Sequence, residues 1–254
     1  WHDWYLAANL GEGDLLDGHL LPGLNPLGVP RGLKGTAFPF RYNHFEELEA
    51  IVRTHKNEIA AIVMEPLRGE EPAHGFLERV RELASKSGAV MIFDEITSAF
   101  RLNTGGVHLL YGVDPDIAVF AKAISNGYPM GAIIGSGKVM KAAQSTFISS
   151  TYWTERIGPT AALATISKHR QFDVSKHLMA TGKKIQEIWK CSANKADIKI
   201  HISGILPLSS FSFDYPSGQA MMTLFTQMML ERGFLAAGKF YASYAHQDIH
   251  ITAY

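Results

Sequence analysis

Three short apolar runs, each closed by a charged residue, constrain the fold of this chain more than any other feature of its sequence. They are IAAIVMEP at 59–66, GAVMIFDE at 88–95 and DIAVFAK at 116–122. Apolar and polar residues do not alternate within them, which is typical of strands buried on both faces of a parallel sheet. Between the first two runs, residues 76–84 carry apolar side chains at helical spacing. The sequence therefore predicts an α/β fold with a mostly parallel sheet.

The charged residues that close these runs are the first indication of a site. Glu65, Asp94 and Lys122 stand at or next to the carboxyl ends of the three runs. Carboxyl ends of parallel strands meet at one edge of a sheet, and ligands of open α/β sheets bind beyond that edge. A buried ammonium group is costly unless it is paired or neutralised, so Lys122 needs a partner or a function. We therefore expect the three residues to converge on one site.

Helix signals surround the first runs. The segment 43–58 has a helical pattern with Asn43 as a candidate N-cap and Glu46 three residues later, the arrangement of a capping box. Gly88 is the expected C-cap of the helix that contains residues 76–84. The segment 1–42 is rich in Gly, Pro, Leu and aromatic residues. We expect it to be a long, ordered, loop-like region, because it is too apolar to be disordered.

The second half of the chain has a different pattern. Helical segments there flank a region in which apolar and polar residues alternate, as they do in paired strands. Its expected elements are helices at 159–170 and 174–191, paired strands within 195–216, a helix at 221–232 followed by Gly233, a strand or turn region at 234–246, and the start of a last helix at 247–254. We predict a domain boundary near residue 172. It gives a large domain of residues 1–172 and a smaller C-terminal α/β domain of residues 173–254.

Composition excludes several classes of protein. The 254 residues have a formal net charge of zero, and no basic stripe of the kind that binds nucleic acid is present. No apolar run approaches the roughly 18 residues of a membrane-spanning helix. The single cysteine, Cys191, excludes an internal disulfide framework and fits a reducing compartment. We therefore expect a cytoplasmic protein that binds neither nucleic acid nor a membrane.

Lys122 and Asp94 together suggest a specific chemistry. A lysine whose pKa is lowered by burial or by a neighbouring cation is a nucleophile that forms Schiff bases with carbonyl groups. When the carbonyl belongs to pyridoxal 5′-phosphate (PLP), a carboxylate is also needed at the pyridine nitrogen, so that the ring accepts electrons. Asp94, one strand earlier, is the candidate carboxylate. From the residues alone, a buried Asp94–Lys122 ion pair, or an acid that merely caps its strand end, remains an equally simple explanation.

Longer segments point to one family. They include GAVMIFDEITSAFR, YGVDPDIAVFAKAISNGYPMGAIIG, STYWTERIGPTAALAT and FYASYAHQDIHI. In order and spacing these segments resemble the class III, fold type I PLP-dependent aminotransferases, and within these the branch of glutamate-1-semialdehyde aminomutase. The resemblance implies PLP as cofactor and a large PLP-binding domain followed by a smaller C-terminal domain. It also implies a phosphate-binding loop that would lie before Trp1, so we expect part of the N-terminal region to be missing.

The resemblance also implies roles for individual residues. Lys122 matches the lysine that forms the Schiff base with the cofactor, and Asp94 matches the aspartate at the pyridinium nitrogen. Ile96 matches the branched aliphatic residue that packs on one face of the ring. Thr154 matches the threonine that binds the cofactor phosphate of the partner subunit, which implies a homodimer with shared active sites. A plain helix N-cap is the alternative role for Thr154.

Three further residues are weaker candidates for contact with a substrate. Glu70 matches a gating acid of the ornithine-type branch, although it could simply be an exposed loop acid. Arg156 could bind a carboxylate with two hydrogen bonds, or form an ion pair with Glu155. Trp153 could shape the substrate pocket. His246, Asp248 and His250 are spaced like metal ligands, but polar residues at the start of a terminal helix explain them better, and we expect no metal site.

The sequence thus predicts a transaminase that moves an amino group between a small-molecule amine and a carbonyl acceptor through Lys122. Two departures from the aminomutases, ISNGYP at 124–129 and ERIGP at 155–159, favour an ordinary transaminase. The first alternative is intramolecular amino transfer of the glutamate-1-semialdehyde 2,1-aminomutase type. A non-catalytic scaffold with the same fold is the further alternative.

Overall fold

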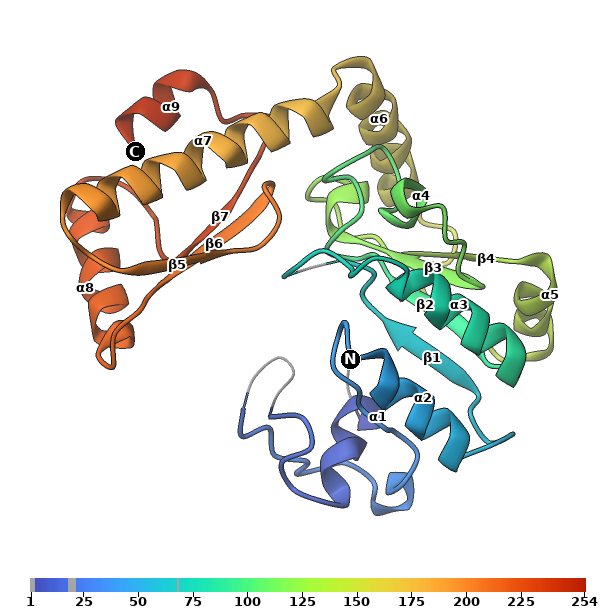
Figure 1. The fold of residues 1–254 in the computed structure, drawn as a ribbon. Coiled ribbons are helices and arrows are strands. Elements are labelled where there is room, and N and C mark those ends of the chain that lie inside the picture. Colours follow the sequence, from blue (N-terminus) through green and yellow to red (C-terminus); the bar gives the residue numbers. More distant parts are fainter. Residues whose placement is uncertain (1–2, 18–21, 68) are drawn as a thin grey trace. The chain divides into compact units, whose positions relative to one another are not determined.

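The computed structural model describes residues 3–17, 22–67 and 69–254 of the chain. The chain forms two compact units (Figure 1). One unit contains residues 1–62 and 72–89, and the other contains residues 63–71 and 90–254. No helix among the described residues is long and apolar enough to cross a membrane.

The smaller unit is built around two amphipathic helices. Its elements are α1 (Asp3–Leu6), η1 (Ala7–Leu10), η2 (Arg31–Leu33), α2 (Phe45–Thr54) and α3 (Phe76–Ser87). The guanidinium carbon of Arg79 on α3 lies 3.9 Å from the ring centre of Phe45 on α2, a cation–π contact that joins the two helices. Gly88 ends α3 in the left-handed region with φ 76°, so the predicted C-cap is confirmed.

The predicted N-cap of α2 is wrong. The helix starts one residue later than an Asn43 cap implies, with His44 at the N-cap position and no side-chain capping hydrogen bond. Asn43 instead has a φ of 63°, and its Oδ1 accepts a hydrogen bond of 2.8 Å from the backbone N–H of Ala73. Asparagine tolerates the left-handed region better than most residues. Its side chain therefore connects the segment before α2 to the segment before α3, a long-range contact that a local motif does not reveal.

A four-stranded sheet forms the framework of the candidate site. Its strands follow the order β1-β2-β3-β4. The bounds are Ala61–Met64 for β1, Val90–Asp94 for β2, Ile117–Phe120 for β3 and Ala132–Gly135 for β4. β2 and β3 are parallel, with Asp94 opposite Val119, whereas β4 runs antiparallel to β3. The α/β architecture is confirmed, and the edge strand β4 is its antiparallel member.

Short helices and one long helix surround this sheet in the larger unit. They are α4 (His108–Tyr111), η3 (Lys122–Ile124), α5 (Gly137–Met140), η4 (Lys141–Ser145) and α6 (Ile157–Gln171). Ala162 of α6 packs into a buried cluster with Phe100, Phe120 and Ile124, which fixes α6 against β3. The predicted boundary near residue 172 falls between α6 and α7, inside the larger unit, and stays a prediction.

The C-terminal part of the larger unit is a three-stranded antiparallel sheet covered by a long helix (Figure 1). Trp189 and Ile185 of α7 pack against Phe211 of β6 and Ile251 of α9. The paired strands, the helix before Gly233 and the last helix are confirmed. The elements are α7 (Val174–Lys195), β5 (Ile200–Ser203), β6 (Leu208–Phe213), α8 (Gly218–Glu231), β7 (Lys239–Tyr241) and α9 (Asp248–Ala253).

Candidate active site

Asp94 and Lys122 follow neighbouring parallel strands, as predicted. Asp94 is the last residue of β2, and Lys122 comes two residues after the end of β3. The backbone N–H of Glu95 donates to the carbonyl of Val119 over 2.9 Å, so the strand pairing continues past Asp94. Because backbone hydrogen bonds hold both strand ends, the two side chains emerge from a rigid edge.

Lys122 is exposed and held by one hydroxyl group. Its Nζ donates a hydrogen bond of 2.9 Å to Oγ1 of Thr97. The residue has a φ of 53°, a conformation uncommon for a non-glycine residue that concentrates at functional sites. The sequence led us to expect a buried ammonium group, and this is wrong: the amine is accessible. Thr97, its partner, was not among the predicted site residues.

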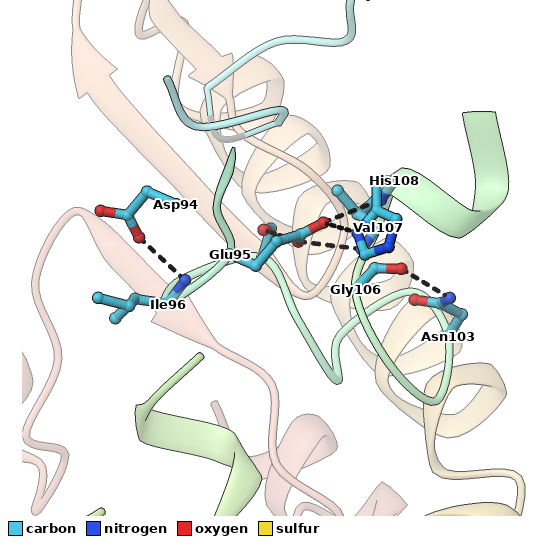
Figure 2. Close-up of polar contacts among 8 residues, drawn as sticks. Asp94, Glu95, Ile96, Asn103, Gly106, Val107 and His108 are labelled. Carbon is cyan, nitrogen blue, oxygen red and sulfur yellow. Dashed lines mark hydrogen bonds and ion pairs between the residues drawn. The ribbon is translucent and has the colours of Figure 1, made fainter. Parts of the chain in front are cut away.

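Asp94 is buried, with 8% of its surface exposed. Its Oδ1 accepts a hydrogen bond of 3.0 Å from the backbone N–H of Ile96, so the carboxylate is bonded to the turn that follows its own strand (Figure 2). The Ile96 side chain is half-buried in the same turn. Asp94, Ile96, Thr97 and Lys122 thus belong to one edge of the sheet.

Glu95 anchors this turn from the opposite side. Figure 2 shows its side chain pointing away from Asp94, toward Val107 and His108. Its carboxylate is completely buried and accepts four hydrogen bonds. The donors are Ser98 Oγ at 2.5 Å, Val107 N at 2.9 Å, His108 N at 2.9 Å and His108 Nδ1 at 2.8 Å.

These hydrogen bonds control the ionisation of Glu95. Burial by itself works to raise the pKa of this carboxyl group, but the hydrogen bonds from His108, Ser98 and the two backbone amides outweigh burial and lower the pKa. Gly106 leaves the necessary room, because a Cβ there would lie 2.4 Å from His108 Nδ1 and 2.8 Å from a Glu95 oxygen. The charged carboxylate therefore ties the end of β2 to the start of α4.

A buried histidine provides a second anchor for the same loop. His169 of α6 donates from Nε2 to the carbonyl of Phe100 over 3.1 Å. Its Nδ1 lies 2.7 Å from the hydroxyl of Thr104, which donates to it when the ring is neutral. Burial lowers the pKa of His169, against weaker opposing effects of Phe100 and Asp173. The neutral ring therefore connects α6 to the segment that follows Asp94.

The segment that contains Thr154 has the opposite character. Thr154 lies in an exposed turn, and its neighbours Tyr152 and Trp153 are 77% and 68% exposed. The alternative role of Thr154 as an N-cap is wrong, because the carboxylate of Glu155 accepts hydrogen bonds from the backbone N–H groups of Ile157 and Gly158 at the start of α6. Glu155 is bonded to the helix and not to Arg156.

The remaining predicted site residues lie at the surface. Glu70, Trp153 and Arg156 are exposed, and their roles toward a substrate stay predictions. The three polar residues near the C-terminus have structural roles around α9. His246 accepts from the backbone N–H of Ser243, His250 accepts from that of Gln247, and Asp248 pairs with Lys184 at 2.6 Å.

Comparison with known proteins adds independent findings. The family model described as "Aminotransferase class-III" matches residues 39–238. A 3-aminobutyryl-CoA aminotransferase from Cloacimonas acidaminovorans is 31% identical over 84% of this chain and 50% of its own length. A glutamate-1-semialdehyde 2,1-aminomutase from Pelotomaculum thermopropionicum is 31% identical over 99% of this chain and 62% of its own length. The chain thus spans about half to three fifths of the length of these curated relatives.

Solved structures support the fold. The FumI protein of Sphingopyxis sp. MTA144, in its PLP internal aldimine form, superposes with a TM-score of 0.84 at 20% identity. The superposition covers 91% of this chain and 58% of the other. The likeness therefore confirms the predicted fold of a PLP-dependent transferase.

Proposed function

Because this chain belongs to the class-III aminotransferase family, we propose that it carries out PLP-dependent amino transfer, with Lys122 as the residue that binds the cofactor. The amino group moves from a small-molecule amine to a carbonyl acceptor. The observation that carries the proposal is the sheet edge itself: an accessible lysine amine and a buried aspartate carboxylate follow neighbouring parallel strands.

The residues at this edge fit the chemical demands of PLP. An accessible primary amine, whose partner among the described residues is the neutral hydroxyl of Thr97, is available for a Schiff base. The buried carboxylate of Asp94 suits a protonated ring nitrogen, and half-buried Ile96 offers an apolar surface beside it. PLP, when bound, supplies a ring that withdraws electrons from the substrate carbon.

The chain's own residues then have distinct tasks. Asp94 holds a proton at the ring nitrogen by electrostatic attraction. Lys122 Nζ takes the proton that leaves the substrate carbon and returns it at the next position, as base and then as acid. Thr97 Oγ1 holds the amine while it is not bonded elsewhere. Glu95 keeps the turn between Asp94 and Thr97 in place through its four hydrogen bonds.

Substitution of Lys122 tests the proposal directly. The holoenzyme should show a visible absorbance band that borohydride abolishes, and Lys122→Ala should lack it while retaining the circular dichroism of the folded protein. Asp94→Asn should keep the band but lose at least about 100-fold in turnover, since general acid–base and electrostatic contributions reach this size. A visible band that persists in Lys122→Ala would refute the role of this lysine, and absence of a band in the parent protein would favour the non-catalytic scaffold.

Intramolecular amino transfer is the second candidate, and the similarity to a glutamate-1-semialdehyde 2,1-aminomutase over 99% of the chain favours it. The two reactions use the same residues and differ in their need for a second substrate. A transaminase requires a separate carbonyl acceptor and shows ping-pong kinetics. An aminomutase converts a single substrate without an added 2-oxo acid, so product formation in the absence of any acceptor would identify it.

We further propose a homodimer in which Thr154 contacts the cofactor phosphate of the partner subunit. Exposed apolar side chains in this region support it, because large exposed patches mark interaction sites. Phe147 is 97% exposed, and Ile148, Tyr152, Trp153, Ile157 and Leu163 are exposed as well. The single cysteine, Cys191, is free, which supports a cytoplasmic location.

The dimer is tested by Trp153→Glu. A charge in place of a buried interface tryptophan should weaken association by at least about 2 kcal/mol, the usual size for such residues. Sedimentation at micromolar concentration should then show monomers, whereas the control Leu235→Glu, at an exposed apolar residue outside this segment, should remain dimeric. An unchanged dimer in Trp153→Glu would place the interface elsewhere.

A further inference from the structure

An exposed asparagine–glycine pair lies in the turn that follows Lys122. Asn126 and Gly127 form the only such pair in the sequence, and both residues are exposed. They stand between η3, which begins at Lys122, and β4. Asparagine is a thermolabile residue, and a following glycine has no side chain to shield the peptide bond between them. The side-chain amide of Asn126 is therefore sterically accessible to the backbone nitrogen of Gly127.

The turn leaves both of these groups without hydrogen bonds. Asn126 has a φ of 49° and Gly127 a φ of 100°, in the left-handed range that asparagine and glycine tolerate. The Ser125 hydroxyl donates to the carbonyl of Tyr128, and the N–H of Tyr128 donates to the carbonyl of Ser125 over 3.3 Å. Among the described residues, neither the side-chain amide of Asn126 nor the N–H of Gly127 has a hydrogen-bond partner. The closed turn thus exposes an amide and a backbone nitrogen that are both available to react.

Two other asparagines share this backbone conformation but differ in their hydrogen bonds. Asn43 has a φ of 63° and Asn57 a φ of 67°. The side-chain oxygen of Asn43 accepts a backbone hydrogen bond. Asn57 is exposed, but the N–H of the next residue, Glu58, donates to the carbonyl of His55 over 3.0 Å. Among these three asparagines, Asn126 alone combines a glycine neighbour with an unbonded backbone nitrogen.

We propose that Asn126 is a site of spontaneous deamidation. The backbone nitrogen of Gly127 attacks Cγ of Asn126 and loses its proton, so a new N–C bond closes a cyclic imide. The bond from Cγ to the side-chain nitrogen breaks, and ammonia leaves. Water then opens the imide at either carbonyl, which gives aspartate or isoaspartate. The overall reaction consumes water and releases ammonia, and it requires neither an oxidant nor a second protein.

Either product alters the region that presents Lys122. Aspartate adds a negative charge close to this lysine in the chain, and isoaspartate adds a methylene to the main chain inside the turn closed by Ser125 and Tyr128. Ser125 and Ile124 are buried, and Ile124 packs in the same cluster as Phe120 at the end of β3, so the turn is not free to move. The conversion should therefore weaken binding of PLP. This consequence rests on the proposed function, whereas the deamidation itself does not.

Peptide mass analysis measures the modification directly. The holoenzyme is kept at physiological temperature and mildly alkaline pH, because base removes the proton of the attacking nitrogen, and is then digested. The peptide that contains Asn126 should gain one mass unit and separate into an aspartate and an isoaspartate form. The peptide that contains Asn57, which has the same exposure and backbone conformation, should remain unchanged. Equal conversion of the two asparagines, or an unchanged Asn126 peptide, would overturn the proposal.

The variant Asn126→Gly separates this modification from other effects of ageing. Glycine tolerates the φ of 49° and has no amide to lose. The parent protein should lose its visible absorbance in step with deamidation, whereas Asn126→Gly should retain it, and freshly prepared Asn126→Asp should bind PLP more weakly than the parent. An equal loss in the parent and Asn126→Gly, or an unchanged absorbance in the deamidated parent, would refute the effect on PLP binding.

Failure of the proposed amino transfer would appear differently, as absence of the visible absorbance in freshly prepared parent protein. The mass analysis would still decide whether Asn126 deamidates, because it does not depend on the cofactor.

Discussion

The end of β2 is predicted to bind the cofactor of its own chain and the segment around Thr154 that of the partner subunit, and the two regions differ in almost every physical property. At the end of β2, Asp94 and Glu95 are buried and hydrogen-bonded. Around Thr154, the aromatic side chains are largely exposed. The backbone there is held by short-range hydrogen bonds within turns, such as the one that Glu155 N donates to Tyr152 O. The strand end is thus held within a single chain, whereas the exposed segment fits the proposed contact with a second one.

This difference follows from how each region obtains its hydrogen bonds. Strand pairing and a buried carboxylate hold the end of β2, so its geometry depends on folding of the larger unit. The Thr154 segment satisfies its backbone locally and contributes little buried apolar area. Substitutions at the strand end should therefore reduce stability together with function, whereas substitutions near Thr154 should reduce function alone.

The largest effect is expected for Glu95→Ala. It removes one buried charge and leaves His108, Ser98 and two backbone N–H groups without their acceptor. Each buried donor left without its acceptor costs about 1–3 kcal/mol, so the total loss should be at least about 3 kcal/mol. Urea denaturation should show this loss, while Glu187→Ala, on the exposed side of α7, should change stability by less than about 0.5 kcal/mol. Equal stability of the two variants would contradict the anchoring role of Glu95.

The sequence predicted the positions of Asp94 and Lys122 at the strand ends better than the exposure and contacts of the residues around them. The apolar runs were sufficient to place Asp94 and Lys122 on neighbouring strands, because buried parallel strands leave a clear pattern. The same pattern suggested that Lys122 is buried, although its exposure depends on the turn after β3 and its φ of 53°. The proposed roles of Ile96 and Thr154 came from family resemblance, since spacing alone does not distinguish them from ordinary turn residues.

What the sequence missed are contacts between distant segments. Glu95 is the last residue of the run GAVMIFDE and drew no prediction of its own, but its hydrogen bonds reach Val107 and His108 after an intervening loop. His169 gave no signal at all, because its partners Phe100 and Thr104 are more than 60 residues away in the chain. The Gly105-Gly106 pair was the available clue to a close approach, since a Cβ at Gly106 would collide with His108.

The second prediction concerns the pH dependence of His169, which anchors the strand-end region. Its pKa is lowered below the ordinary value of 6.5, so the unfolded state takes up a proton more readily than the folded state. The stabilisation that the neutral His169 ring provides is therefore complete above pH 6.5, and it is lost as the pH falls from 6.5 toward the pKa of His169 in the folded protein. His169→Gln should be less stable than the parent protein by about 1 kcal/mol at pH 8, the usual value of a hydrogen bond.

The difference between the two proteins provides the measurement. Denaturation at pH 8, 6.5 and 5.5 should show that the stability gap narrows as the pH falls, because only the parent protein loses this contribution. The pKa of His246 is also lowered, but both proteins contain His246, so its contribution cancels when the two stabilities are subtracted. A gap that widens toward pH 5.5 would mean that His169 is charged in the folded protein.

The smallest effect on stability is expected for Thr154→Ala. This substitution tests most directly whether the end of β2 and the Thr154 segment differ as described. Thr154 is exposed and belongs to a turn whose helix is capped by Glu155, so the free energy of unfolding should change by less than about 0.5 kcal/mol. If its hydroxyl donates to the cofactor phosphate, the dissociation constant for PLP should rise about tenfold. Fluorescence titration with PLP measures this, with Thr223→Ala on α8 as the control. Because the two readouts are independent, a loss of stability with unchanged PLP affinity would show that the Thr154 segment is structural, and the contrast between the two halves of the site would no longer hold.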